Sequence, residues 1–518
     1  MTLTADGRAD TYIRQPAIDI VHYEISVELS DASDSITAIA KIQVRMREES
    51  VSGMRLDLAG MQVDSLRVRG NRRTYQYSDG QLSFDFDRPY RRDQIAAIEV
   101  RYHGKPERGL LIGKNKYGRR VFFTENWPDH AHYWLPSIDH PSDKATVEIA
   151  VTAPAKYGVV SNGRLIEAKP LRNGRKLTRW TASKAIPTYC IALGVAEFSV
   201  SHQQNADGVP IAWYSYPEDT ESAARKFRPT AEAIAFFSSL IGPYPYEKLA
   251  QVQASVSFGG MENSSAIFYK ESLIQESPVT EDPVPHEIAH QWFGDSVTQA
   301  DWDHLWLSEG FATYLEALFH ARLYGADALK QTMADSAKRL NSDEMARRTP
   351  VIDPTQTDLL KKLNLINYEK GAWVLHMLRG LVGDDTFFQG IRRYYRLHEG
   401  GNATSDDFRD AMESVSGGSL SDFFRQWLYQ PGWPEYRISW HWNDTTNEVE
   451  LEFYQNQSTG LFDMPIEVVF EQEQRREARK FRIFNATHSF RIPLQEKPLS
   501  VEADPDGWIL KSVSIDQF

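Results

Sequence analysis

The chain has 518 residues, of which 41% are hydrophobic and 25% charged, and its formal net charge is −13. A chain of this length rarely has a single hydrophobic core, so we expect two to four packed units. The negative net charge argues against a general affinity for nucleic acid or anionic membranes, because both are polyanions. Cys190 is the only cysteine, which excludes an intramolecular disulfide and leaves histidine, aspartate and glutamate as candidate metal ligands.

The N-terminal stretch is polar and contains no apolar signal core; it reads MTLTADGRADTYIRQPAID. No window of the sequence approaches the roughly eighteen apolar residues that a membrane-spanning helix needs. The sequence therefore predicts a cytoplasmic protein with no membrane partner. A chain from which an export signal had been removed would look the same.

Residues 18 to 200 are rich in β-branched side chains and alternate between apolar and polar. The clearest segments are IVHYEISVEL, ITAIAKIQVRM, YQYSDGQLSFDF around a Ser-Asp-Gly turn, KATVEIAVTAP, and GVVSNGRLIE around an Asn-Gly turn. A period of two is typical of strands that bury one face. We therefore predict an N-terminal antiparallel β domain over residues 1–203.

After a polar stretch near residues 203–210 the period becomes helical, as in TESAARKFRPTAEAIAFFSSLIG, where Pro229 predicts a break or kink. Helical patterns continue to about Tyr429, where QPGWP ends them. From Tyr436 the alternation returns in YRISWHW, NEVELEFYQ, MPIEVVFEQ and KFRIF, which indicates a small β-sandwich. The predicted fold class is multidomain α+β, with a mostly helical domain over residues 204–433 and a C-terminal β-sandwich over residues 434–518.

The stretch PHEIAHQWFG has the spacing of a metal site on a helix. Pro285 suits the first turn, and Gly294 suits the end. Residues four apart share a face, so His286 and His290 can bind one ion, while Glu287 points to the side where a water would lie.

A second helix follows in WLSEGFATYLEALFHARLYG, with Glu309 in its first turn and Gly325 at its end. Two histidines and one glutamate leave the fourth tetrahedral position open, as in catalytic zinc sites. A bare His-Glu-x-x-His arises by chance in some long chains, and solvent-facing His and Glu on a helix are ordinary. The second helix with its glutamate favours the metal site.

These motifs resemble a known family. HEIAHQWFGDSVT followed by WLSEGFATYLE is similar to the gluzincin zinc peptidases, and FGGMENSSAIFY narrows the resemblance to the M1 aminopeptidases, relatives of leukotriene A4 hydrolase and aminopeptidase N. Further similar segments, in the family's order, are WLPSIDHPSDKATVEI, NYEKGAWVLHMLRGLVG, NATSDDFRDAMESVSG and FFRQWLYQPGWPEY. The resemblance therefore covers nearly the whole chain, and it implies that the helical domain is a thermolysin-like catalytic domain.

The resemblance implies a zinc-dependent aminopeptidase that hydrolyses the N-terminal bond of peptides with a free N-terminus. One zinc ion per chain would be bound by His286, His290 and Glu309, and Glu287 would be the general base. Tyr368 matches the donor that stabilises the oxyanion; without the family, a core role for this tyrosine would be the default. Glu316 matches a carboxylate that orients a histidine ligand.

In the family, the glutamate of the GGMEN segment binds the α-ammonium of the substrate, and here this is Glu262. Such an anchor sets the distance from the substrate amine to the scissile carbonyl, because only the bond after the first residue then lies over the metal. Gly259 and Gly260 would let an edge backbone approach the substrate, and the segment also includes Met261 and Asn263.

The sequence departs from the family at two places. The family supplies a second amine-binding Gln or Glu from the β domain, but Trp127 occupies the expected position, with Glu125 two residues earlier. We expect Glu125 to be the second anchor; alternatively, Trp127 walls the pocket for the first side chain. Large members also add a helical domain after the sandwich. Because this chain stops at Phe518, we expect a more open active site that accepts peptides of varied length.

Three other functions remain to be weighed. Hydrolysis of a lipid epoxide, as by leukotriene A4 hydrolase, would use the same zinc but needs a deep apolar tunnel. A non-catalytic M1-like scaffold protein would be indicated by loss of a ligand or of the base, and none is lost. Glu262 argues against an endopeptidase.

Overall fold

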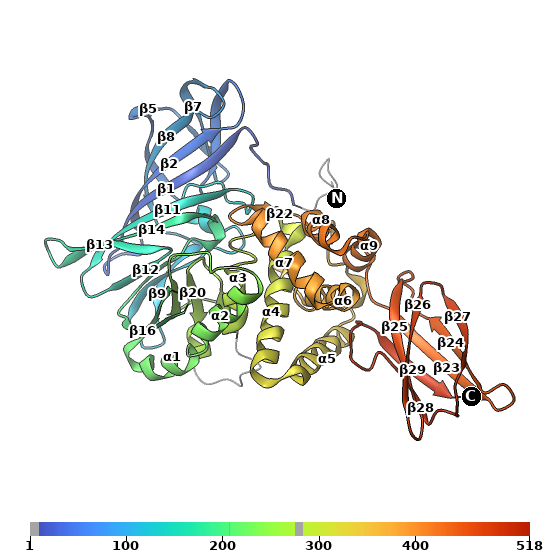
Figure 1. Cartoon of the computed structure of the whole chain (residues 1–518). Coiled ribbons are helices and arrows are strands. Elements are labelled where there is room, and N and C mark those ends of the chain that lie inside the picture. Colours follow the sequence, from blue (N-terminus) through green and yellow to red (C-terminus); the bar gives the residue numbers. More distant parts are fainter. Residues whose placement is uncertain (1–9, 207, 275–282, 518) are drawn as a thin grey trace. The chain divides into compact units, whose positions relative to one another are not determined.

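The computed structural model of the chain describes residues 10–206, 208–274 and 283–517. These residues form two compact units, and Figure 1 shows their strands and helices along the chain. The N-terminal unit comprises Asp10–Trp302 and Tyr395–Thr404, and the C-terminal unit comprises Asp303–Tyr394 and residues 405–517. None of the described helices is long and apolar enough to cross a membrane.

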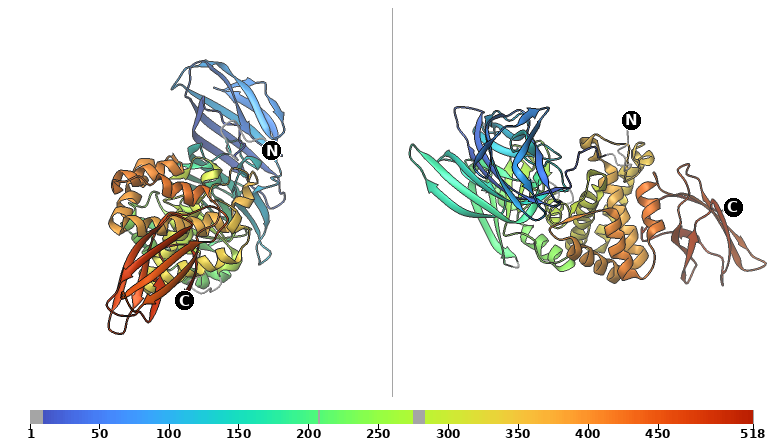
Figure 2. Two further views of the ribbon diagram at one scale, coloured as in Figure 1. Left: turned by 90° about the vertical axis from the view of Figure 1, so that its right-hand side faces the viewer. Right: turned by 90° about the horizontal axis from the view of Figure 1, so that it is seen from above.

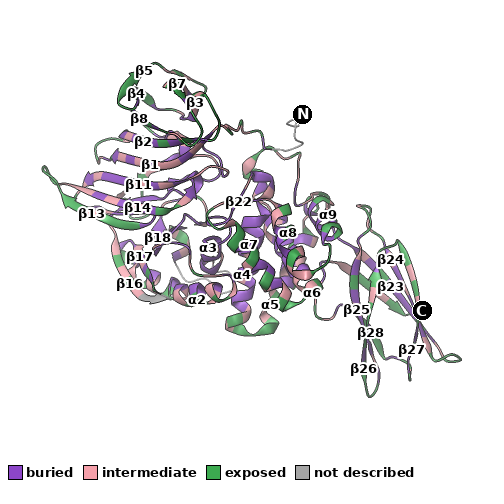
Figure 3. Cartoon of the chain, turned by 45° about the horizontal axis from the view of Figure 1, so that its top comes forward, coloured by how far each residue is buried: buried purple, intermediate pink, exposed green. Residues whose placement is uncertain are grey.

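The largest sheet of the N-terminal unit has eight strands in the order β13-β14-β11-β1-β2-β8-β4-β5. Residues of β2 alternate between buried and more exposed positions, as the period of two predicted, and Figure 3 shows this alternation along the sheet. The prediction of an N-terminal β domain is therefore confirmed. The strands are β1 (Ile18–Glu28), β2 (Ile36–Met46), β4 (Gln62–Val68), β5 (Asn71–Arg73), β8 (Ile95–Gly104), β11 (Lys144–Pro154), β13 (Arg164–Pro170) and β14 (Arg175–Pro187).

One pair in this sheet is not antiparallel. β1 and β11 run parallel, with His22 opposite Thr146, whereas the other neighbours in the sheet are antiparallel. A parallel pair needs a crossover, and the whole segment from β2 to β10 supplies it here. Periodicity cannot reveal such a pairing, because a strand buries one face in the same way in either direction.

Two smaller sheets, together with the eight-stranded sheet, make up the β part of the N-terminal unit, which is residues 18–196. One has the order β12-β15-β10-β9, with β9 (Gly109–Lys114), β10 (Arg120–Glu125), β12 (Gly158–Ser161) and β15 (Leu193–Ala196). The other has the order β3-β7-β6, with β3 (Val51–Asp57), β6 (Gln76–Ser78) and β7 (Gln81–Tyr90). The predicted Asn162-Gly163 turn is present, but it joins β12 to β13 in a different sheet rather than forming a hairpin.

A five-stranded sheet in the order β16-β17-β18-β20-β19 lies where a helical pattern was predicted to begin. Its strands are β16 (Ser199–Ala206), β17 (Val209–Ser215), β18 (Leu249–Ala254), β19 (Gly260–Met261) and β20 (Ala266–Lys270). All residues of β18 are buried, so this strand has no alternation to reveal it. β16 runs through residue 203, and the division into three domains at 203 and 433 stays a prediction.

The helices of the N-terminal unit are α1 (Thr220–Lys226), α2 (Thr230–Leu240) and α3 (Val284–His290). Pro229 is the N-cap of α2, which confirms the predicted break between α1 and α2. α3 packs against α2 and against β19. The short pair of β21 (Thr298–Gln299) and β22 (Asn402–Ala403) joins the segment after α3 to residues 395–404.

The C-terminal unit begins with helices and ends with strands, as predicted. Its α-helices and its π-helical turn are α4 (Trp306–Tyr324), α5 (Ala326–Ser342), the π-helical turn (Ile366–Lys370), α6 (Gly371–Val382), α7 (Asp384–His398), α8 (Ser405–Ser416) and α9 (Ser421–Tyr429). The last turn of α7, from Tyr395, belongs to the N-terminal unit. α9 ends at Tyr429, where QPGWP follows.

The strands that follow form two sheets, β27-β24-β23-β29 and β26-β25-β28, which Figure 2 shows in red from two further sides. They are β23 (Glu435–Asn443), β24 (Glu448–Gln455), β25 (Met464–Glu471), β26 (Arg476–Ile483), β27 (Thr487–Pro493), β28 (Ser500–Ala503) and β29 (Ser512–Gln517).

A lysine of the large sheet holds the loop that follows α3. Nζ of Lys144, at the start of β11, donates to the carbonyl oxygens of Asp295 at 2.9 Å, Ser296 at 2.8 Å and Gly401 at 3.1 Å. An ammonium group has three donors, and here each has a carbonyl acceptor. Lys144 therefore ties the β part to the segment after the helix that carries His286 and His290.

We expect Lys144→Met to lower the free energy of unfolding of the N-terminal unit by about 2–4 kcal/mol, because three carbonyls lose their shared donor. The matched control is Lys41→Met, which removes an exposed ion pair with Glu24 (2.7 Å) and should cost less than about 1 kcal/mol. Urea unfolding followed by circular dichroism measures both. Equal costs for the two variants would contradict the role of Lys144.

Candidate metal and amine-binding site

The helix α3 presents both predicted histidines on one face. Pro285 lies in its first turn, where a missing N–H leaves no unpaired donor. Nε2 of His286 and Nε2 of His290 lie 3.1 Å apart. Two nitrogen ligands at about 2.0–2.1 Å from a tetrahedral zinc ion are about 3.3 Å from each other, so this spacing fits one shared ion.

The hydrogen bonds of His290 set its tautomer. Its Nδ1 lies 3.1 Å from the carbonyl oxygen of Phe293. Because a carbonyl only accepts, Nδ1 carries the proton and donates, which leaves the lone pair of Nε2 for a metal. The ring is also buried, so its orientation is fixed.

The third predicted ligand is Glu309, in the first turn of α4 and buried. One donor atom from each of His286, His290 and Glu309 lies within 4.8 Å of the others. Two imidazoles and a carboxylate are a donor set that fits zinc and leaves a coordination position open. Cys190 is no ligand of this set: burial raises the pKa of its thiol, which donates to Asp295 Oδ1 at 3.1 Å.

Glu287 lies directly against the strand β19. A Cβ added to Gly260 would be 2.0 Å from Glu287 Oε1 and 2.4 Å from Glu287 Cδ, so the Glu287 side chain would have to move. At Gly259 the nearest neighbour of an added Cβ would be Leu273 Cδ1, at 3.4 Å. Glycine at position 260 therefore lets the backbone approach the carboxylate without displacing it.

Glu262 follows β19, which is the edge strand of the five-stranded sheet. β19 pairs antiparallel with β20, with Met261 opposite Phe268. Met261, Glu262 and Asn263 are all buried, Glu262 with 7% of its surface exposed. The turn continues to Ser265, which has a φ of +64°, and the amide of Ala266 donates to the carbonyl of Asn263 at 2.9 Å.

Glu125, at the end of β10, contacts the segment just before Gly259. Its Oε1 accepts from the amides of Ser257 at 2.8 Å and Phe258 at 3.0 Å, and from the Ser257 hydroxyl at 2.6 Å. In the described part of the chain, Oε2 accepts only from the same hydroxyl. Trp127 packs edge-on against Phe258 and Trp302, with ring centroids 5.9 and 5.5 Å apart.

Tyr368 lies in the π-helical turn before α6 and is half-buried. The neighbouring Gly371 touches Gly310 of α4 backbone to backbone, because a Cβ on Gly310 would lie 2.8 Å from Gly371 Cα. This contact fixes the turn of Tyr368 against the helix that carries Glu309. Glu316 lies two turns further along α4 and is also half-buried.

Gln291 is a residue of this region that sequence reasoning missed. It follows His290 directly, is fully buried, and its amide donates to the backbone carbonyl of Glu262 at 2.8 Å. A polar residue at the end of a helix is ordinary, and only its place beside His290, a predicted metal ligand, could have drawn attention to it.

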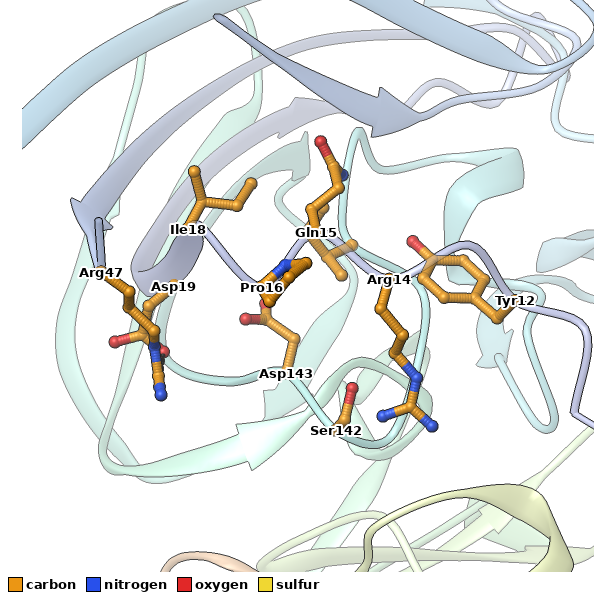
Figure 4. A pocket seen from close by; sticks show the side chains of 10 residues that line it. Tyr12, Arg14, Gln15, Pro16, Ile18, Asp19, Arg47, Ser142 and Asp143 are labelled. Carbon is orange, nitrogen blue, oxygen red and sulfur yellow. Dashed lines mark hydrogen bonds and ion pairs between the residues drawn. The ribbon is translucent and has the colours of Figure 1, made fainter. Parts of the chain in front are cut away.

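A separate cavity of about 330 Å³ lies in the N-terminal unit (Figure 4). Its charged groups are largely matched: Arg14 pairs with Asp10 at 3.1 Å, and Arg47 with Asp19 at 2.6 Å. Burial raises the pKa of Asp143 there to about 8. The cavity is lined by none of the predicted site residues; it is lined by Tyr12, Arg14, Gln15, Pro16, Ile18, Asp19, Arg47, Ile138, Ser142 and Asp143.

Comparison with known proteins gives matches over both parts of the chain. Residues 226–427 match the peptidase family M1 domain, and residues 20–190 match the peptidase M1 N-terminal domain. A probable aminopeptidase 2 of Sulfurisphaera tokodaii is 27% identical over 87% of this chain and 58% of its own length. A leucyl aminopeptidase of Saccharolobus solfataricus is 26% identical over 82% of this chain and 55% of its own. The chain thus spans a little over half the length of these relatives.

Two solved structures are also similar. An M1 zinc metallopeptidase from Deinococcus radiodurans is 26% identical, with a TM-score of 0.71 over 82% of this chain and 97% of its own. An aminopeptidase A of Legionella pneumophila, in complex with aspartic acid, has a TM-score of 0.85 over 98% of this chain and 60% of its own. Its identity of 19% shows a shared fold alone.

Proposed function

Because the chain belongs to the M1 peptidase family, we propose that it is a zinc-dependent aminopeptidase that releases the first residue of peptides with a free N-terminus. One observation carries this proposal: the backbone of Glu262 is hydrogen-bonded to Gln291, the residue that follows His290. The backbone that carries a carboxylate suited to an α-ammonium is thereby tied to the end of the helix with the two candidate metal-binding imidazoles, an arrangement that suits exopeptidase cleavage.

In this proposal His286, His290 and Glu309 hold one zinc ion per chain. The ion would lower the pKa of a bound water to about 7 and polarise the substrate carbonyl. Glu287 takes the proton of the attacking water and passes it to the leaving amine. Tyr368 donates a hydrogen bond to the carbonyl oxygen as negative charge develops there, a contribution typically worth about a hundredfold or more in turnover. Glu316 supports the ligands through hydrogen bonding.

Two glutamates bind the α-ammonium group of the substrate in this proposal. Glu262 accepts the α-ammonium, and Glu125 is the second carboxylate, because its Oε2 retains acceptor capacity and the residue lies against Ser257 and Phe258. The backbone of Gly259 and Gly260 runs beside the substrate at the free edge of the sheet, with Met261 and Asn263 flanking the anchor.

We expect the protein to cleave aminoacyl anilides with a free amine and to lose this activity in the presence of a zinc chelator. N-acetylated anilides should be cleaved at least about a hundredfold more slowly, because acetylation removes the charge that pairs with Glu262. A panel of anilides, each free and acetylated, with and without chelator, measures this. Cleavage of acetylated anilides at the rate of the free ones, or cleavage that persists in the presence of the chelator, would contradict the proposal of a zinc-dependent aminopeptidase.

The same panel tests the anchor itself. Glu262→Gln should raise the KM for free-amine anilides about tenfold to a hundredfold, because a charge-assisted hydrogen bond becomes a neutral one, while the bound zinc stays at one ion per chain. An unchanged KM would show that Glu262 does not bind the amine.

We expect Gly260→Ala to reduce turnover at least about a hundredfold with little loss of stability. The new methyl group displaces the Glu287 carboxylate, which is the flexible end of a side chain, rather than any backbone. Gly259→Ala is the matched comparison, with its nearest contact at 3.4 Å, and should cost less than about tenfold. Turnover rates and melting temperatures of both variants, compared with those of the wild-type protein, test this prediction. Similar losses of activity would mean that the backbone approach at position 260 does not govern Glu287.

A further inference from the structure

The turn that contains Glu262 is joined to α3 through one side-chain amide. Gln291 Nε2 donates to the Glu262 carbonyl at 2.8 Å and to Asp295 Oδ2 at 2.9 Å. Its Oε1 accepts from the Ser265 amide at 2.7 Å and from the Tyr244 hydroxyl at 3.1 Å. A primary amide offers two donors and two acceptor sites, so the whole capacity of this buried group is used.

The opposite side of the same turn is held by other buried groups. Asn162 Nδ2 donates to the Ser264 carbonyl at 2.6 Å, and Lys248 Nζ donates to the Ser265 carbonyl at 2.7 Å. The backbone amide of Gly163 donates to the Ser265 hydroxyl at 2.7 Å. These contacts fix the turn to Asn162, Gly163 and Lys248, whereas the Gln291 amide fixes it to the end of α3, directly after His290.

We propose that Gln291 is a positioning residue that sets the distance between Glu262 and the two histidines, and thereby the preference for substrates with a free α-amine. The inference rests on the proposed function. Gln291 touches neither substrate nor metal in this role. It holds the Glu262 backbone, from which the side chain with the anchoring carboxylate extends. A misplacement of about 1 Å in such a constellation can reduce rates about a hundredfold.

Two substitutions separate the two halves of the amide. Gln291→Glu keeps an acceptor for the Ser265 amide and the Tyr244 hydroxyl, and in its carboxylate form it cannot donate to the Glu262 carbonyl. Gln291→Met has a similar length and can do neither. The control is Gln253→Met in β18, where an equally buried amide accepts from the Tyr216 amide at 2.9 Å and donates to Asp219 at 2.6 Å.

Binding of two zinc-chelating probes provides a readout that needs no turnover. Leucine hydroxamate carries the α-amine, and isocaproic hydroxamate is the same molecule without it, so the ratio of their affinities reports the amine site alone. We expect this ratio to fall about tenfold or more in both Gln291 variants, as for the loss of one well-placed hydrogen bond. Zinc content should stay at one ion per chain, and Gln253→Met should keep the wild-type ratio.

An unchanged ratio in folded Gln291 variants would overturn the proposal, as would equal weakening of both hydroxamates, which would place the effect at the metal. Failure of both variants to fold with zinc would also overturn it, because the amide would then serve stability alone. A wild-type protein with no preference for the amino hydroxamate would instead refute the proposed function, so the two failures are distinguishable.

Discussion

The approach of an edge strand to a helix is the constraint on which the rest of this molecule depends. At Gly260 the strand β19 lies so close to Glu287 that a side chain there would displace the Glu287 carboxylate. This approach brings the candidate general base beside the backbone that leads to the candidate amine anchor, Glu262. Both lie in one compact unit with His286 and His290, so their spacing does not rely on the movement of one unit against the other.

Such a contact has to be rigid, and buried polar groups make it so. Gln291, Asn162 and Lys248 each donate to a carbonyl of the turn after β19, and Lys144 donates to three carbonyls in the loop after α3. Buried donors and acceptors are costly when they are left unpaired, so each bond penalises any other arrangement of these loops. Hydrophobic packing would stabilise the unit as well, but it would not fix a distance so closely.

Much of this arrangement follows from the sequence. The period of two predicts the β strands, Pro285 predicts the start of α3, and Gly325 predicts the end of α4. The predicted end of the first helix at Gly294 is wrong, because α3 ends at His290. The spacing of His286, His290 and Glu309 predicts a set that the structure brings together. The sheet that carries Glu262 escaped prediction, because β18 is buried on both faces and shows no alternation. The parallel pairing of β1 with β11 and the four contacts of Gln291 depend on where distant segments meet, which no local pattern encodes.

The central claim is that the distance from amine to metal decides which bond is cut. A peptide whose first residue is β-homoleucine tests it directly, because one added methylene separates the amine from the carbonyl while both groups remain. If Glu262 and the histidines form a fixed ruler, kcat/KM for this peptide should be at least about a hundredfold below that of the leucine peptide, since the carbonyl no longer meets the metal when the amine is bound. Equal values for the two peptides would contradict the account.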